Sequence, residues 1–170
     1  MIYNLEYYEH MLRIYSKTAE QICKIRWNFI KEIKLLTILD YGSGVGWFRA
    51  YRPKDIEVDS YDIANYPQTG IQKKEYDLVC FWDVLEHLEN FNQIKSLLIN
   101  TKAVAVSMPI KPKKIKLENW KHFKPNEHLH YFTIETLDAL FKTYNFIKLK
   151  GGYPECPPRT DVYSALYKKG

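Results

Sequence analysis

The stretch ILDYGSGVG, residues 38–46, decides the fold of this chain. It is typical of a buried strand that ends at an acidic residue, Asp40, and runs directly into a loop with Gly42, Gly44 and Gly46. Glycines on alternate positions let the backbone turn sharply and lie close to a flat ligand, because no Cβ intrudes. Open α/β sheets bind nucleotide-like ligands at the carboxyl end of such a strand. The stretch therefore predicts an open α/β sheet with a ligand site at this loop.

The spacing of the glycines separates two classes of ligand. The dinucleotide fingerprint G-x-G-x-x-G would need a glycine at Trp47, so a nicotinamide oxidoreductase is disfavoured. The pattern from Asp40 to Gly46 is D-x-G-x-G-x-G, which resembles motif I of the class I S-adenosylmethionine-dependent methyltransferases. The resemblance implies S-adenosylmethionine as the cofactor and S-adenosylhomocysteine as the product.

Length and composition are those of one globular domain. At 170 residues, with 46% hydrophobic and 26% charged residues, the chain is long enough to bury an ordinary core. We expect an N-terminal helical segment over residues 1–34 and a Rossmann-like core over residues 35–170. No apolar run reaches the length of a membrane span, and the N-terminus does not resemble a signal peptide, so no membrane partner is expected. Three widely separated cysteines favour a reduced, cytoplasmic location, and the net charge of +5 permits an anionic partner without requiring one.

Strand-like and helix-like segments alternate along the chain. Strands are expected over residues 36–41, 56–62, 76–82, 103–108, 146–149 and 162–167. Helices are expected over residues 5–33 (as one helix or two), 47–51, 83–100 and 133–144, the last of them capped by Thr133. This alternation predicts an α/β fold: a Rossmann-like, mostly parallel sheet flanked by helices. The last two strands have no helix between them, so one antiparallel strand is expected near the C-terminus.

Three further segments extend the resemblance over nearly the whole chain. They are VDSYDIA at residues 58–64, YDLVCFWDVLEHL at residues 76–88 and HLHYFTIETLDALFKTYNF at residues 128–146. With the glycine loop they stand in the same order as in the small-molecule branch of these methyltransferases. That branch includes quinone-ring and sugar O-methyltransferases, so the resemblance implies a small hydroxylated acceptor.

The resemblance also implies which residues hold the cofactor. Asp40 would accept hydrogen bonds from the ammonium group of its amino-acid tail. Asp62, after the second strand, would accept from both ribose hydroxyls, with Asp59 as the alternative carboxylate. The remaining residues implied to line the cofactor are Tyr41, Gly42, Ser43, Gly44, Gly46, Ile63 against the adenine, and Phe81, Trp82 and Asp83 toward the methyl donor.

The sequence departs from the family pattern on the adenine side. Only 13 residues separate Asp62 from Tyr76, where the family usually has a full helix, a further strand and an acidic residue that reads the adenine amino group. At most a short strand over Ile71–Lys73 fits into this space. The chain therefore resembles a minimal version of the fold.

Two groups of polar residues are candidates for the chemistry. Asp83, Glu86 and His87 would share one helical face, where they could bind a hard divalent ion or relay a proton. Bracing of the helix by Glu86 and His87 is favoured instead, and no metal site is predicted. His128 and His130, two residues apart, could bind metal, serve as a general base or fix a loop by hydrogen bonding. We take His130 first and His87 second as candidates for a catalytic base.

A lysine-rich loop over residues 111–124 lies beside the expected substrate entrance. Its aromatic residues, Trp120 and Phe123, could stack on sugars or bases. An anionic substrate could bind the lysines at the start of this loop, which are Lys111, Lys113, Lys114 and Lys116. Solvated lysines without a ligand are the commoner case.

The residues after the fourth expected strand help to rank the acceptor classes. The (D/N/S)-P-P-(Y/F) signature of amino-methylating DNA methyltransferases is absent, because residues 107–110 read Ser-Met-Pro-Ile. A sugar, a nucleotide-linked sugar or a phenol- or quinone-like acceptor is therefore favoured over nucleic acid. Two alternatives stay open: an RNA-directed methyltransferase that uses the basic loop, and a catalytically weak or inactive partner subunit that lacks tight cofactor binding.

Overall fold

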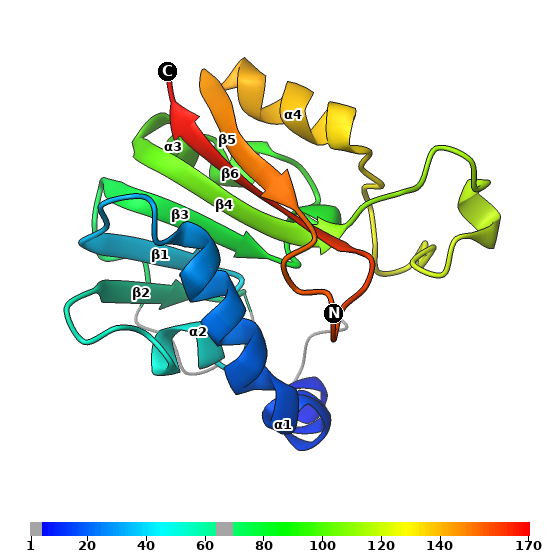
Figure 1. The fold of residues 1–170 in the computed structure, drawn as a ribbon, viewed down its shortest axis with the longest axis horizontal. Coiled ribbons are helices and arrows are strands. Elements are labelled where there is room, and N and C mark those ends of the chain that lie inside the picture. The colour runs from blue at the N-terminus through cyan, green and yellow to red at the C-terminus, as the bar shows by residue number, and fades with distance from the viewer. Residues whose placement is uncertain (1–4, 64–69) are drawn as a thin grey trace.

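The computed structural model describes residues 5–63 and 70–170, which form a six-stranded sheet with helices on both faces (Figure 1). The strands are β1 (Thr37–Tyr41), β2 (Glu57–Tyr61), β3 (Tyr76–Trp82), β4 (Thr101–Pro109), β5 (Phe146–Gly152) and β6 (Val162–Lys169). They lie in the order β2-β1-β3-β4-β6-β5. The first four strands are parallel, and β6 is antiparallel to both of its neighbours. The predicted Rossmann-like sheet with an antiparallel strand near the C-terminus is confirmed.

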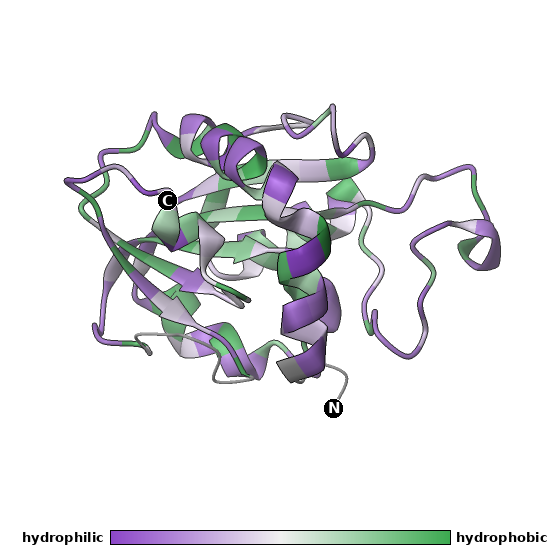
Figure 2. Ribbon diagram, turned by 90° about the horizontal axis from the view of Figure 1, so that it is seen from below, coloured by the Kyte–Doolittle hydropathy of each residue, from purple (hydrophilic) through white to green (hydrophobic). Residues whose placement is uncertain are grey.

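One face of the sheet is covered by α1 (Leu5–Ile30) and the single turn α2 (Trp47–Ala50). Cys23, Trp27 and Ile30 of α1 are buried with the alternate β3 residues Leu78 and Cys80 in one core cluster. The period of two along a strand places every second side chain on this face. Figure 2 shows many hydrophilic residues on α1, although Leu12, Ile14 and Tyr15 of its first half are also exposed.

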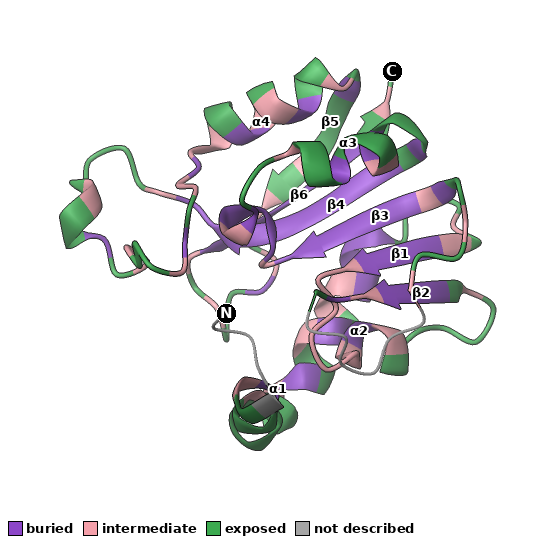
Figure 3. Ribbon diagram, turned by 180° about the vertical axis from the view of Figure 1, so that it is seen from behind, coloured by how far each residue is buried: buried purple, intermediate pink, exposed green. Residues whose placement is uncertain are grey.

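The other face is covered by α3 (Asn92–Ile99) and α4 (Ile134–Thr143). Leu137 and Phe141 of α4 are fully buried with Val79 and Phe81 of β3 in a second core cluster. The central strands β1, β3 and β4 are buried along most of their length (Figure 3), as is typical of parallel strands covered on both sides.

The last helix forms as the sequence predicts. Thr133 caps α4 by accepting a hydrogen bond from the backbone N–H of Thr136, whose side chain in turn accepts from the Thr133 N–H. Asn145 follows the helix with φ of 64°, the left-handed conformation that ends many helices. Strand β5 begins at the next residue.

The helix expected over residues 83–100 is wrong in its first half. Asp83 has φ of 61°, so the chain leaves β3 in a left-handed turn. A short 3-10 turn, η1 (Leu85–His87), comes next, and Leu88 is extended before α3 begins at Asn92. The Asp83 N–H donates to the Ser107 carbonyl at 2.7 Å, a bond between strand ends that local sequence does not reveal.

The N-terminal helix and the adenine side also differ in detail from the expectation. α1 is one continuous helix that ends at Ile30, three residues before the predicted end. No strand forms over residues 70–75, so the short strand considered at Ile71–Lys73 is not formed and β2 is the edge of the sheet in the described part of the chain. The part of the expected loop over residues 64–69 lies outside the described residues. All three cysteines are free, and none of the helices described has the length and apolar character needed to cross a membrane.

Candidate cofactor and active site

The glycine loop has the conformation that its sequence requires. Gly42, Gly44 and Gly46 have φ of 75°, 54° and 81°, a region that residues with a Cβ rarely adopt. The Gly42 N–H donates to the Tyr61 carbonyl at 2.7 Å, which ties the loop to the end of β2. A Cβ on Gly42 would lie 2.4 Å from a methyl carbon of Val84. The loop therefore presents bare backbone at the carboxyl ends of β1 and β2.

Asp40 is a buried carboxyl group that lacks a partner on one side. It is 2% exposed, and its Oδ2 accepts no hydrogen bond from any residue that the structure describes. Burial raises the pKa of Asp40 to about 7, and the negative charge of Asp62 adds to this rise, while Arg26 opposes it. A cationic ligand at this position would supply the missing partner and favour the ionised form.

Asp62 lies directly at the glycine loop. Its Oδ2 accepts a 2.8 Å hydrogen bond from the Gly44 N–H, and its Oδ1 accepts one of 2.7 Å from the hydroxyl of Tyr8. The carboxyl group thus bridges the loop and the first helix. Since α1 lies over it, Asp62 is only 6% exposed.

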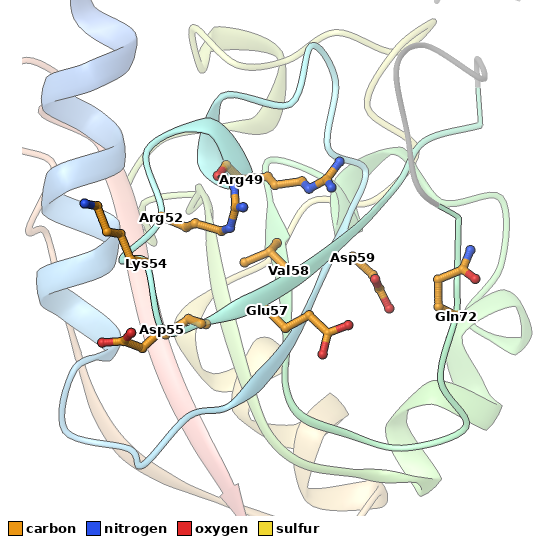
Figure 4. A pocket seen from close by; sticks show the side chains of 9 residues that line it. Arg49, Arg52, Lys54, Asp55, Glu57, Val58, Asp59 and Gln72 are labelled. Atoms are coloured by element: carbon orange, nitrogen blue, oxygen red, sulfur yellow. Dashed lines mark hydrogen bonds between the residues drawn. The ribbon is translucent and has the colours of Figure 1, made fainter.

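Asp59, the alternative carboxylate, faces elsewhere. It accepts a 2.7 Å hydrogen bond from the hydroxyl of Tyr76. It also lines a surface depression beside β2, together with Arg49, Glu57 and Gln72 (Figure 4). The structure therefore places Asp62, and not Asp59, beside the glycines.

The remaining residues predicted to line the cofactor are in different environments. Phe81 is fully buried in the core and its ring packs against that of Tyr41, so its side chain serves the core. Trp82 packs against Phe48 and lies under the guanidinium group of Arg26. Ile63 is next to Asp62 and is 60% exposed. Ser43 lies in the loop with a buried hydroxyl. Their contacts with the cofactor stay predictions.

Asp83 is held by two arginines from distant parts of the chain. Arg159 pairs with both of its oxygens at 2.6 and 2.8 Å, and Arg26 of α1 reaches Oδ2 at 3.0 Å. Burial favours the neutral carboxyl, but the two guanidinium groups hold the pKa of Asp83 well below its usual range. Asp83 is therefore a charged part of the framework at the end of β3.

Glu155 completes this charged cluster. Its Oε1 accepts hydrogen bonds from Arg26 and from the hydroxyl of Ser107, both at 2.8 Å, and its Oε2 accepts one of 2.9 Å from Arg159. Sequence reasoning missed Arg26, Glu155 and Arg159. Two signals were available: Arg26 interrupts the apolar face of its helix next to Trp27, and the other two lie four residues apart in a loop between strands.

His87 and His128 meet beside η1, although 40 residues separate them. Their rings are 4.8 Å apart at 78°, and Nδ1 of His87 donates to the carbonyl oxygen of Glu127 at 2.9 Å. Burial lowers the pKa of His87, and burial together with the nearby His87 lowers the pKa of His128 to about 4. Both rings are therefore neutral at pH 7. Burial also raises the pKa of the adjacent Glu86 well above its usual range.

His130, the first candidate for a catalytic base, fixes a loop through its side-chain contacts. Its Nε2 donates to the carbonyl oxygen of Leu88 at 2.8 Å, and its ring packs against Phe91. These contacts tie the loop to the segment before α3. The arrangement brings His87, rather than His130, into the group at the end of β3.

The comparison with protein families decides the class of the protein. A family model described as a methyltransferase domain matches residues 7–150. The chain belongs to this methyltransferase domain family. The match includes the glycine loop, Asp62, Arg26 and Asp83 of the charged cluster, and the histidines beside η1, whereas Glu155 and Arg159 lie beyond it. No curated protein sequence matches the chain.

Solved methyltransferases share the fold of this methyltransferase. A SAM-dependent methyltransferase from Archaeoglobus fulgidus matches with a TM-score of 0.68 and 16% identity over 96% of this chain and 100% of the other. Magnesium protoporphyrin IX methyltransferase from Synechocystis PCC 6803, with bound SAH, matches with a TM-score of 0.69 and 17% identity. This match covers 98% of this chain and 95% of the other. A longer protein from Nostoc punctiforme also matches, with a TM-score of 0.65 and 15% identity. The match covers 96% of this chain but only 59% of the Nostoc protein.

The residues of this methyltransferase fit S-adenosylmethionine, the cofactor of the family. The unpartnered oxygen of Asp40 suits the ammonium group of the amino-acid tail. Asp62 suits the ribose hydroxyls, which are hydrogen-bond donors. The glycine loop leaves room for the ligand between them, since even a Cβ on Gly44 would meet nothing closer than Tyr8 at 3.9 Å.

Proposed function

We propose that this methyltransferase transfers the methyl group of S-adenosylmethionine to a hydroxyl group of a small acceptor, such as a sugar or a phenol-like ring. The observation that carries the proposal is the neutral, half-buried His87 beside the end of β3. Its Nδ1–H is bound to the Glu127 carbonyl, which makes Nε2 the basic nitrogen. A hydroxyl is a poorly acidic nucleophile and gains from such a base.

The binding and proton-transfer roles would fall to different residues of the chain. When bound, the cofactor supplies a methyl group on a positively charged sulfur. Asp40 and the glycine loop hold its amino-acid tail, and Asp62 holds the ribose. α1 excludes water from this side, since Tyr8 already contacts Asp62. His87 takes the proton of the acceptor hydroxyl as its oxygen attacks the methyl carbon in line with the sulfur.

The geometry gives less support to a nucleic-acid acceptor. The end of β4, where amino-methylating enzymes carry their signature, is occupied by the hydrogen bond from Ser107 to Glu155. In the basic loop, which projects past the carboxyl ends of β3 and β4 (Figure 1), Lys111 binds the carbonyls of Pro112 and Ile115. Lys113 pairs with Glu135. Of the four lysines predicted to bind an anionic substrate, Lys114 and Lys116 are the stronger candidates.

The proposal is tested by transfer of a radiolabelled methyl group to a panel of sugars, nucleotide-linked sugars and phenols, with total RNA in parallel. We expect transfer to a small hydroxyl compound, reduced about 100-fold or more in His87→Asn but not in His130→Asn. Salt-sensitive transfer to RNA alone would support the RNA-directed alternative. Tight cofactor binding without transfer to any acceptor on the panel would count against a hydroxyl acceptor.

A further inference from the structure

Glu86, His87 and His128 form a compact group of metal-ligating side chains. Among the residues that the structure describes, they are the one group of three whose ligand atoms all lie within 4.8 Å of one another. Nε2 of His87 is 3.9 Å from Oε1 of Glu86. Atoms that share a zinc-like ion at bond lengths of about 2.0–2.2 Å lie about 3–4 Å apart, so a small adjustment of the side chains would suffice. We propose that this group binds one divalent transition-metal ion.

Glu86 supplies an independent reason to expect a ligand. The residue is 3% exposed, and its Oε2 has no hydrogen-bond partner in the described part of the chain. A buried carboxyl oxygen without a partner is costly, and native structures rarely contain one without a function. The other oxygen of this carboxyl group, Oε1, is the one 3.9 Å from Nε2 of His87, so a cation bound by both carboxylate oxygens would also satisfy Oε2.

The backbone fixes the three residues in this arrangement. The Glu86 carbonyl accepts hydrogen bonds from the N–H groups of Leu129 at 2.7 Å and His130 at 3.1 Å, which clamp η1 against the segment that carries His128. Nδ1 of His87 is bound to the Glu127 carbonyl, so that its Nε2 is directed to the group. Metal-binding histidines are commonly oriented by such a second hydrogen bond.

The three proposed ligands differ from Asp83, Glu86 and His87, the three residues that helical spacing grouped together. Asp83 is not available as a ligand, because Arg159 and Arg26 occupy both of its oxygens. Instead, His128 completes the set from a distant segment. One carboxylate and two imidazoles suit zinc, manganese, iron(II) or cobalt better than magnesium or calcium, and leave coordination positions open for water or a substrate oxygen.

The role of the ion rests on the proposed function, whereas its binding does not. The group lies directly after the end of β3, at the same carboxyl edge of the parallel strands where Asp40 and Asp62 lie. An acceptor hydroxyl bound to the ion would lose its proton to solvent more readily, its oxygen would bond to the methyl carbon, and the carbon–sulfur bond would break to release S-adenosylhomocysteine. In the metal-bound protein His87 would be a ligand and the ion would activate the acceptor hydroxyl in its place, whereas in the metal-free protein His87 would be the proton acceptor.

Binding is tested on the untagged, full-length protein after removal of metal by a chelator. We expect Co²⁺ to bind with a stoichiometry of one per chain, giving visible absorption bands that Zn²⁺ displaces. Glu86→Gln, His87→Asn and His128→Asn should each weaken binding by about tenfold or more, as loss of even an indirect metal contact often does. The matched changes His10→Asn on α1 and His130→Asn should leave affinity unchanged.

Thermal unfolding with and without Zn²⁺ shows whether the variants fold. The wild-type protein should unfold at a higher temperature with the ion, because the ion binds the folded state, and the three ligand variants should lose this shift while still unfolding cooperatively. Absence of binding at millimolar Co²⁺ and Zn²⁺, or equal binding in all three variants, would overturn the site. Cofactor titration of the metal-free protein separates this result from the proposed function, since S-adenosylmethionine should bind whether or not the metal does.

Discussion

The hydroxyl of Tyr8 donates a 2.7 Å hydrogen bond to Oδ1 of Asp62, the carboxylate assigned to the ribose. The bond spans 54 residues and joins the first helix to the end of β2. Because Asp62 is buried beneath this contact, a ribose can reach its Oδ1 only after the N-terminal part of α1 shifts. Cofactor binding and the position of α1 are thus coupled through one hydrogen bond.

We expect Tyr8→Phe to bind S-adenosylmethionine about threefold to tenfold more tightly than wild type. Without the hydroxyl, a larger fraction of the protein has Asp62 accessible, and the apparent dissociation constant falls by that factor. The free energy of unfolding of the cofactor-free protein should fall by about 1–2 kcal/mol, since a buried carboxylate loses a donor. Isothermal titration and urea denaturation measure the two effects.

Tyr7→Phe is the matched control, because it removes the neighbouring hydroxyl and leaves Tyr8 on Asp62. It should change cofactor affinity by less than the Tyr8 variant does. Weaker binding by Tyr8→Phe would mean that Tyr8 positions Asp62 for the ribose instead of competing with it.

Cofactor affinity should rise with pH as Asp40 ionises. With its pKa near 7, Asp40 is mostly neutral at pH 6 and mostly charged at pH 8, so binding of the cationic tail should strengthen about tenfold over this interval. Binding near pH 7 should release protons. Titrations in buffers of different ionisation enthalpy measure both effects, and Asp40→Asn, which keeps Arg26 and Asp62, should abolish the pH dependence.

The same group affects the stability of the cofactor-free protein with the opposite sign. The folded pKa of Asp40 is above its unfolded value of 3.8, so the folded state binds the proton more tightly. The contribution of Asp40 to stability is therefore largest at low pH and is lost as the pH rises from about 4 to about 7. If wild type and Asp40→Asn showed the same pH dependence of unfolding over this range, the carboxyl would not be perturbed as described.

Local pattern was enough to predict the strands, the glycine loop and the capped helix α4. The glycines, Asp40 and Thr133 act through backbone conformation within a few residues, which the sequence displays. The turn at Asp83 was missed because its left-handed conformation depends on Arg159 and the Ser107 carbonyl, which are distant in the chain. For the same reason, helical spacing grouped Asp83 with His87, whereas folding pairs Asp83 with arginines and brings His128 to His87.

Gly42→Ala should destabilise the protein more than Gly44→Ala. Both substitutions place a Cβ at positive φ, which costs about 1–2 kcal/mol. At Gly42 the new methyl group would also lie 2.4 Å from Val84, adding an overpacking cost of about 1–3 kcal/mol, whereas at Gly44 the nearest atom is 3.9 Å away. Chemical denaturation of both variants measures the difference.

The added cost at Gly42 can be assigned by relieving the contact. In the background of Val84→Ala, Gly42→Ala should cost less than in wild type, because the methyl group it meets is gone. Equal costs in the two backgrounds would show that backbone strain alone accounts for the loss.

Glu155→Gln should destabilise the protein by about 3 kcal/mol. The carboxylate is 0% exposed and bonds both Arg26 and Arg159, so its removal leaves two largely buried guanidinium groups with only Asp83 to balance them. The effect should be insensitive to salt, since buried pairs are weakly screened. Glu20→Gln, which breaks the exposed pair with Lys24 on α1, is the control and should leave the free energy of unfolding almost unchanged, because solvent screens exposed pairs. Similar small changes in both variants would mean that solvent reaches the cluster and that Asp83 alone suffices to hold the arginines.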